Sequence, residues 1–235
     1  MRYAIYFTPS ADDPLTRRAS HWLGRDAFTG AAIGQPEAGP FRHDDLATLT
    51  ADPRRYGFHA TMKAPFELAP GVTEAEFLAA FDLFAADQAP FRLPSLVLGQ
   101  LGRFFALVPG QPSAALQALA ADCVRLLDRF RAPLSDADMA RRRPESLSSE
   151  ERRNLAAWGY PYVLDAFRFH MTLTGPVEPE DQPAMRQAIE AHFDGLLDQP
   201  RDIASLAIFA EPARGAPFLL HHMAPLGGAA TRKTA

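Results

Sequence analysis

One short pattern occurs twice in the chain, as FHATMK at Phe58–Lys63 and as FHMTLT at Phe169–Thr174. In each copy a histidine follows a phenylalanine, and a threonine follows the histidine two positions later. Side chains alternate across a β-strand, so each copy predicts a strand with one apolar face and one face carrying imidazole and hydroxyl groups. A chain that builds the same strand twice is expected to contain a duplicated fold.

The spacing of other segments supports a duplication. The two histidines are 111 residues apart, and the Ser-Leu pairs that begin at Ser95 and Ser205 are 110 residues apart. Each half is therefore expected to run as a histidine-bearing strand, a helix and a strand pair. The predicted fold class is α+β, with two similar lobes, two antiparallel sheets and flanking helices around a central cleft.

A change in the character of the sequence after residue 132 sets the expected boundaries within the domain. A single bilobal domain is predicted over residues 1–226, with lobes at roughly 1–132 and 163–226. The polar, charge-rich segment 133–162 is expected to leave the main fold as a helical excursion. Residues 227–235 are small and polar, and they are expected to form a flexible tail.

Local signals place some of the turns and helix ends. Asp12 or Asp13 is expected to cap a helix that begins at Pro14, and Thr73 to cap the next long helix. Gly102 is expected to turn a hairpin.

Residues 26–53 are rich in glycine and proline and show no clear periodicity of apolar residues, so they are predicted to be a loop. Further expectations are a strand at 56–67, a strand at 166–175, and a helix capped by Ser148 with Glu151 and ended by Gly159.

The polar faces of the two predicted strands carry the candidate site. Alternation places these residues on them: His59, Thr61 and Lys63 in the first, and Arg168, His170, Thr172 and Thr174 in the second. If the lobes face each other, two imidazoles, hydroxyls and two cations line one cleft. Imidazoles serve as acid and base near neutral pH, and hydroxyls and cations bind phosphate oxygens. A polar face can equally be a solvent-exposed side of the sheet.

Two His-x-Thr strands in duplicated lobes resemble the 2H phosphoesterase superfamily, which includes 2′,3′-cyclic phosphodiesterases and RNA end-processing enzymes. The strings YGFHATMKAPF, RRRPESLSSEERRNLAAWGYPYV and FRFHMTLTGP resemble a narrower branch associated with phosphonate-degradation operons. The resemblance covers roughly residues 1–226. It implies a bilobal α+β fold with a cleft between the lobes, and chemistry without a metal or other cofactor.

Carried over by motif, the resemblance makes His59 and His170 catalytic and makes Thr61 and Thr172 phosphate contacts. Lys63 and Arg168 are candidate phosphate-binding cations from strand geometry alone, outside the family motif. The simplest 2H enzymes lack the 133–162 segment. Their nucleic-acid substrates are therefore a poor guide to the substrate of this chain.

Composition and missing motifs narrow the function further. A net charge of −4 gives no overall attraction to nucleic acid or to an anionic membrane, and no apolar stretch approaches the ~20 residues of a membrane span. Cys123 is the single cysteine, which excludes an internal disulfide, fits a cytoplasmic protein, and is expected to be buried. His221 and His222 are expected to point to opposite faces of a strand, which disfavours a metal pair. The chain has no P-loop, Rossmann or zinc-hydrolase motif.

Arg141–Arg143 have two interpretations, a contact with an anionic substrate or a solvated charged surface.

The leading functional hypothesis is a metal-independent phosphodiesterase acting on a small cyclic or ribose-linked phosphate, with phosphonate catabolism as its setting. The alternatives are a phosphosugar-binding accessory protein without turnover, and an RNA end-processing enzyme. The choice of acid and base, hydrolase or ligase chemistry, and the oligomeric state stay open at this point.

Overall fold

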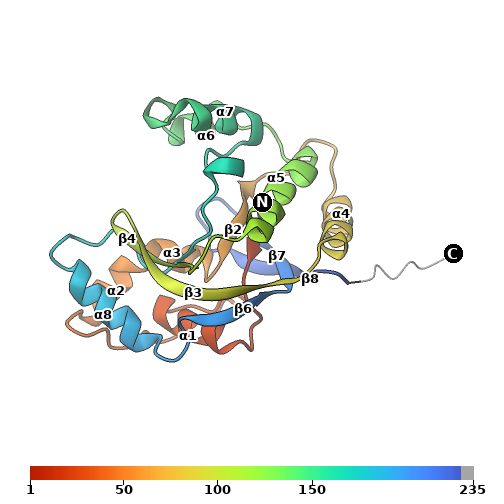
Figure 1. The fold of residues 1–235 in the computed structure, drawn as a ribbon. Helices are drawn as coiled ribbons and strands as arrows, with labels where there is room; N and C mark the ends of the chain where they lie inside the picture. Colours follow the sequence, from red (N-terminus) through yellow and green to blue (C-terminus); the bar gives the residue numbers. More distant parts are fainter. Residues whose placement is uncertain (229–235) are drawn as a thin grey trace.

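Eight antiparallel strands make a single sheet in the computed structural model, which describes residues 1–228 (Figure 1). Their order across the sheet is β6-β3-β4-β5-β2-β1-β7-β8. The strands are β1 (Arg2–Phe7), β2 (Ala60–Phe66), β3 (Phe91–Leu101), β4 (Phe104–Pro109), β5 (Met171–Thr172), β6 (Gln199–Ile203), β7 (Ser205–Glu211) and β8 (Leu219–Pro225).

The expectation of two separate sheets is wrong, because β2 and β5 pair directly. Ala60 lies opposite Met171, and Met171 in turn lies opposite Leu107 of β4, so the hydrogen-bonded ladder is continuous. The predicted lobes also exchange strands. Strands β3 and β4 come from the first lobe but lie on the β5 side, whereas β7 and β8 come from the second lobe and lie beside β1. Each half of the sheet is therefore built from both parts of the chain.

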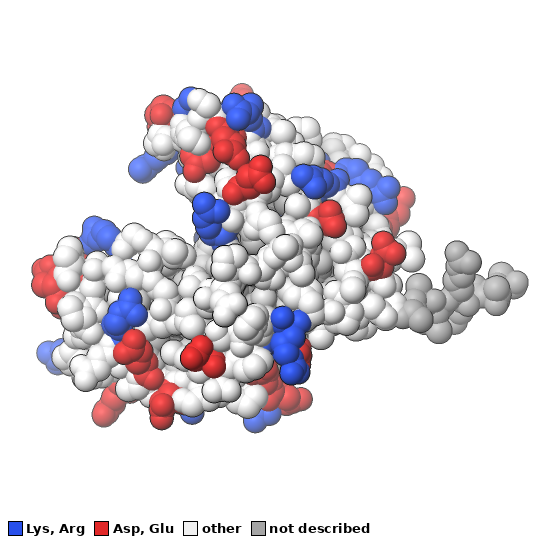
Figure 2. All heavy atoms as spheres, in the orientation of Figure 1, with Lys and Arg blue, Asp and Glu red and all other residues white. Residues whose placement is uncertain are grey.

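Helices lie around this sheet. They are α1 (Pro14–Leu23), α2 (His43–Leu49), α3 (Ala51–Tyr56), α4 (Glu74–Asp87), α5 (Ala114–Leu127), α6 (Asp136–Arg141), α7 (Ser149–Trp158) and α8 (Gln182–His192), with short 3-10 turns η1 (Asp128–Phe130), η2 (Pro144–Ser146) and η3 (Leu164–Ala166). Helices α6 and α7 lie apart from the sheet, at the top of Figure 1. The surface is hollowed between them and the rest of the molecule (Figure 2).

Several predicted ends of elements are confirmed. The Asp13 carboxylate accepts a hydrogen bond from the Leu15 amide at 2.7 Å, and Thr73 forms a capping box at α4. Ser148 caps α7, and Gly159 ends it in the left-handed region. These side chains satisfy amides that have no partner within their own helix. The β3–β4 hairpin turns at Gly102, whose φ of 62° favours glycine.

Other predicted boundaries are wrong. The expected loop at 26–53 contains α2 and part of α3, two short helices that bury little and so show no clear apolar period. The strand expected at 56–67 begins only at Ala60, since Tyr56 ends α3. The strand expected at 166–175 pairs only over Met171–Thr172.

A β-bulge overturns the prediction for the paired histidines of β8. The register between β7 and β8 shifts beside His222, and an extra residue interrupts the alternation of side chains. As a result both imidazoles contact α4. The Nε2 of His221 lies 2.8 Å from the Glu74 carboxylate, and the Nε2 of His222 lies 2.6 Å from the Asp82 carboxylate.

The apolar faces of the strands pack into the core as expected. Phe58 and Phe169 are buried, and Cys123 is a fully buried thiol. A smaller buried cluster on the other side includes Tyr6 and Phe209. Within the described part of the chain, no helix combines the length and apolar character needed to cross a membrane. The tail predicted at 227–235 falls, from residue 229 onward, outside the described residues.

Candidate active site

The two His-x-Thr segments lie side by side at the middle of the sheet. The pairing of Ala60 with Met171 is antiparallel, and continuing this register by one residue in each direction would set His59 opposite Thr172 and Thr61 opposite His170. Direct pairing of β2 with β5 thus brings the four predicted motif residues together. The expectation that they face each other from two separate sheets is wrong, because the two motifs lie next to each other within one sheet.

Both imidazoles are held by the same backbone contact. The Nδ1 of His59 lies 2.9 Å from the carbonyl oxygen of Gly57, and the Nδ1 of His170 lies 2.7 Å from the carbonyl oxygen of Arg168. A carbonyl oxygen can only accept, so Nδ1 must carry the proton and donate it in each case. This leaves the Nε2 of each neutral ring as the nitrogen that can accept or exchange a proton.

Gly57 is required for this arrangement at His59. Its φ of 81° and ψ of 179° lie in a region that only glycine enters readily. A Cβ at this position would lie 2.3 Å from the Cβ of Ala27. The backbone can therefore turn its carbonyl toward the His59 ring only because residue 57 has no side chain.

The His59 ring packs between aromatic groups. It stacks on Tyr6 with 3.8 Å between ring centroids and an interplanar angle of 27°, and Tyr56 lies 6.0 Å away. The Tyr6 ring is itself buried and packs against Phe209. The Nε2 of His59 lies 3.3 Å from the Thr61 hydroxyl, so the free nitrogen already contacts a polar group of the motif.

Burial keeps His59 neutral. Loss of solvation lowers the pKa of His59 to about 4 from its ordinary value of 6.5, and this effect outweighs the hydrogen bond to the Gly57 carbonyl, which favours the charged ring. The nearby His170 lowers the pKa further. His59 is therefore an imidazole with an unprotonated Nε2 at neutral pH, the state that a general base requires.

A pocket of about 280 Å³ opens over this part of the sheet. His59, Thr172 and Thr174 contribute to its lining, and Phe104 and Tyr56 form aromatic walls. His170 packs against Phe104, with 5.9 Å between the ring centroids. The size and the mixture of aromatic walls with a few polar groups suit a small ligand.

Thr174 has a different role from Thr172. Its side chain is fully buried, and its hydroxyl accepts a hydrogen bond from the Phe105 amide at 3.0 Å. This contact ties the segment that follows β5 to β4. Thr172 is only half-buried, which leaves its hydroxyl available to a bound molecule.

A second β-bulge removes Lys63 from the site. Tyr6 pairs with Thr61 but the next residue of β1, Ile5, pairs with Lys63, so β2 contains one extra residue between them. Alternation breaks at that point, and Lys63 does not continue the face that carries His59.

The Lys63 ammonium group is buried and already paired. It donates to the Asp128 carboxylate at 2.7 Å, and its side chain is only 3% exposed. Arg131 binds the same carboxylate, which keeps Asp128 charged opposite both cations. The structure thus gives Lys63 a role in joining β2 to η1, and we do not include it among the proposed phosphate contacts.

Arg168 lies two residues before His170 and is exposed. Its guanidinium donates to the carbonyl oxygens of Phe167 at 3.1 Å and Asp165 at 3.4 Å. Both contacts are with neutral acceptors, and in the described part of the chain Arg168 has no carboxylate partner. Its contact with phosphate stays a prediction.

Sequence reasoning did not find every residue of the site. Tyr6 and Phe104 hold the two imidazoles but belong to strands that carry no motif. Gly57 and the Arg168 carbonyl orient the rings through the backbone, and a carbonyl leaves no signal in a sequence. A glycine two residues before His59 was the one available indication.

Comparison with models of protein families assigns the chain to one family. The model of the family described as "Protein of unknown function (DUF1045)" matches residues 61–219, more than half of the chain. The chain belongs to this family. The matched range includes Thr61, His170 and Thr172.

Two curated relatives carry the name "Ribose 1,5-bisphosphate phosphokinase PhnN". The protein from Janthinobacterium sp. (strain Marseille) is 38% identical over 235 residues, covering 98% of this chain and 52% of the relative. The protein from Laribacter hongkongensis (strain HLHK9) is 37% identical over 220 residues, covering 94% and 50%. The chain therefore spans about half the length of these relatives.

Solved structures with a similar chain path include E. coli LigT complexed with 3′-AMP, with a TM-score of 0.45, 19% identity, and coverage of 96% of this chain and 97% of that one. TT0787 of Thermus thermophilus gives a TM-score of 0.44, 15% identity, and coverage of 97% and 100%. At these TM-scores the resemblance carries no conclusion about the chemistry of this chain.

Proposed function

We propose that this chain is a phosphodiesterase that hydrolyses a small cyclic or ribose-linked phosphate through two histidines, without a metal ion. The observation that carries the proposal is the matched pair of imidazoles, each of which lies one residue before one of two adjacent strands. Each donates Nδ1–H to a backbone carbonyl, and each keeps Nε2 for proton exchange.

His59 is the proposed general base. Its lowered pKa keeps Nε2 unprotonated at neutral pH, so it can accept a proton from a water molecule as the water oxygen attacks phosphorus. The Gly57 carbonyl holds the ring in orientation throughout, and it also stabilises the imidazolium that forms.

His170 is the proposed general acid. In its protonated form it donates the Nε2 proton to the leaving oxygen as the bond between phosphorus and that oxygen breaks. Its Nδ1–H bond to the Arg168 carbonyl is kept in both protonation states. The products are a phosphomonoester and a hydroxyl group, and exchange with solvent restores both histidines.

Thr61 and Thr172 are the proposed contacts to the non-bridging phosphate oxygens, whose negative charge grows during the attack. Arg168 is a further candidate because its guanidinium has donors left for an anion. Among residues 1–228, no group of three or more His, Cys, Asp or Glu side chains is arranged to hold a metal ion. The proposal assigns the acid–base chemistry to the imidazoles.

The names of the curated relatives support a ribose-linked substrate. Ribose 1,5-bisphosphate, the compound in their name, carries a phosphomonoester at C1. Hydrolysis of a cyclic phosphodiester that bridges C1 and C2 produces such a monoester when the bond between phosphorus and the C2 oxygen breaks and that oxygen leaves as the hydroxyl. The proposed substrate class is therefore a cyclic phosphate of ribose, and phosphonate catabolism remains the proposed setting.

The pH dependence of kcat/KM tests the two-histidine mechanism. Activity requires neutral His59 and protonated His170, so the profile should be bell-shaped, with its acidic limb near the His59 pKa of about 4. Substitution of either histidine by alanine should lower the rate by ~10²–10⁴-fold. His43→Ala, which removes an exposed histidine from the start of α2, is the control. A profile without an acidic limb would contradict the role of His59.

A further inference from the structure

A second, larger pocket adjoins the active-site pocket. It has a volume of about 600 Å³, and Tyr56 lines both pockets. Arginines from four separate parts of the chain line it. They are Arg2 of β1, Arg55 of α3, Arg141 and Arg142 at the end of α6, and Arg214 between β7 and β8. We call it the arginine pocket.

The carboxylates of the arginine pocket balance only part of the positive charge of its five arginines. Glu67 and Asp138 line it, and the buried Glu211 lies behind it. Five guanidinium groups therefore face three carboxylates, which leaves an excess of two positive charges. A fully ionised phosphomonoester carries two negative charges and three acceptor oxygens, so it matches this excess.

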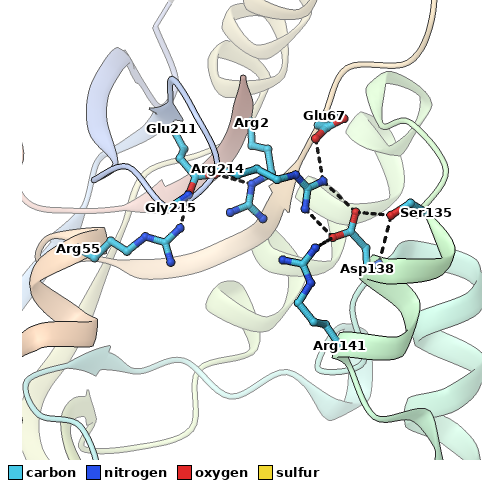
Figure 3. A network of polar contacts seen from close by, with 9 residues as sticks. All are labelled: Arg2, Arg55, Glu67, Ser135, Asp138, Arg141, Glu211, Arg214 and Gly215. Atoms are coloured by element: carbon cyan, nitrogen blue, oxygen red, sulfur yellow. Dashed lines mark hydrogen bonds and ion pairs between the residues drawn. The ribbon is translucent and has the colours of Figure 1, made fainter.

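Two of the three carboxylates, Glu211 and Asp138, each bind two arginines, and some N–H donors of these arginines stay unused (Figure 3). Glu211 accepts from Arg2 at 2.5 Å and also from Arg55. Arg2 uses only its Nε in this contact, and both its terminal nitrogens are without a partner in the described part of the chain. A guanidinium has five N–H donors, and its planar fork fits phosphate oxygens.

The same sharing occurs at Asp138. Arg214 donates to it at 2.7 and 2.9 Å and also reaches Glu67, while Arg141 donates to it at 2.6 Å through one terminal nitrogen. Figure 3 shows the guanidinium groups of Arg141 and Arg214 meeting at this carboxylate. Asp138 thus holds two arginines in place and leaves donors of Arg141 unused.

Arg142 has no ion-pair partner among residues 1–228. Residue Arg142 is half-buried, and its guanidinium carbon lies 4.9 Å from the centroid of the Tyr160 ring. Stacking on an aromatic ring fixes the plane of a guanidinium but leaves its N–H donors free at the edge. Of the five arginines, Arg142 is therefore the one that structural ion pairing does not explain.

We propose that the arginine pocket binds a second phosphate of the substrate, a terminal phosphomonoester on the same sugar whose phosphodiester lies at His59 and His170. The proposal rests on the proposed function for the site of the diester. The two pockets share Tyr56 as a lining residue, which places the arginine pocket next to the proposed site of the phosphodiester. The substrate class narrows to a ribose cyclic phosphate that also carries a phosphomonoester.

Steady-state kinetics with two substrates test this directly. Ribose 1,2-cyclic phosphate is compared with its 5-phosphate, using wild type, Arg142→Gln and the control Arg92→Gln, which removes an exposed arginine of β3 outside both pockets. Arg142→Gln should raise KM about tenfold for the 5-phosphate, a typical effect of losing one charge-assisted contact, with a smaller change in kcat. KM for the compound without the 5-phosphate should not change. Equal effects on both substrates, or no effect, would overturn the proposal.

A binding experiment separates this proposal from the proposed function. Ribose 5-phosphate is titrated into wild type, Arg142→Gln and His59→Ala by calorimetry. Arg142→Gln should weaken binding about tenfold, whereas His59→Ala should not. If neither cyclic phosphate is hydrolysed but this pattern holds, the proposed function fails and the arginine pocket stands. Equal affinity of wild type and Arg142→Gln would overturn the arginine pocket whatever the enzyme hydrolyses.

Discussion

Replacement of His59 should flatten the dependence of folding stability on pH. Burial lowers the pKa of His59 to about 4 in the folded protein, against 6.5 for an exposed histidine. Between these two values the unfolded chain binds more protons than the folded one, so stability falls as pH falls. From the two pKa values, the free energy of unfolding should drop by about 2 kcal/mol between pH 7 and pH 5 through this one group.

The assay is urea unfolding of wild type and His59→Gln at pH 7 and at pH 5, followed by far-UV circular dichroism. Other groups titrate in both proteins, so the informative quantity is the difference between their losses of stability. Wild type should lose about 2 kcal/mol more than His59→Gln over this range. His43→Gln, which removes an exposed histidine, should behave as wild type does. If His59→Gln loses as much stability as wild type, the ring is not desolvated and the argument for a neutral base is wrong.

Two further substitutions test how the site is held. Gly57→Ala should lower the free energy of unfolding by at least about 1–3 kcal/mol, because φ is 81° and the new Cβ would lie 2.3 Å from that of Ala27. It should also lower kcat, since the carbonyl that orients His59 would move. Lys63→Met should lower the free energy of unfolding by about 1–3 kcal/mol while kcat stays close to that of wild type, because Asp128 loses one of its two cations. Unchanged stability with a large loss of kcat would instead return Lys63 to the phosphate site.

The sequence predicted those features of the fold that depend on local chemistry. Helix caps such as Asp13 and Ser148 follow from short side chains that bind free amides, and the buried Phe58 and Phe169 follow from strand alternation. The site motif was found for the same reason, because His59 and Thr61 lie two positions apart in one segment.

Features that depend on distant pairing could not be predicted in this way. The β-bulges that turn Lys63 toward Asp128, and both His221 and His222 toward α4, arise from pairing with neighbouring strands. A count of alternate positions assumes an uninterrupted strand, so it assigns such residues to the wrong face. The direct pairing of β2 with β5, which makes one sheet of two, joins residues as far apart in sequence as Ala60 and Met171 and depends on the whole fold. The arginine pocket likewise gathers residues from distant parts of the chain.

The most direct test of the two-histidine mechanism is the hydrolysis of ribose 1,2-cyclic phosphate, its 5-phosphate and nucleoside 2′,3′-cyclic phosphates in the presence of EDTA. Products are followed by ³¹P NMR for wild type, His59→Ala and His170→Ala. We predict turnover of a cyclic phosphate by wild type in EDTA and a loss of ~10²-fold or more in each variant. Turnover that EDTA abolishes, or that survives in either variant at the wild-type rate, would contradict the mechanism.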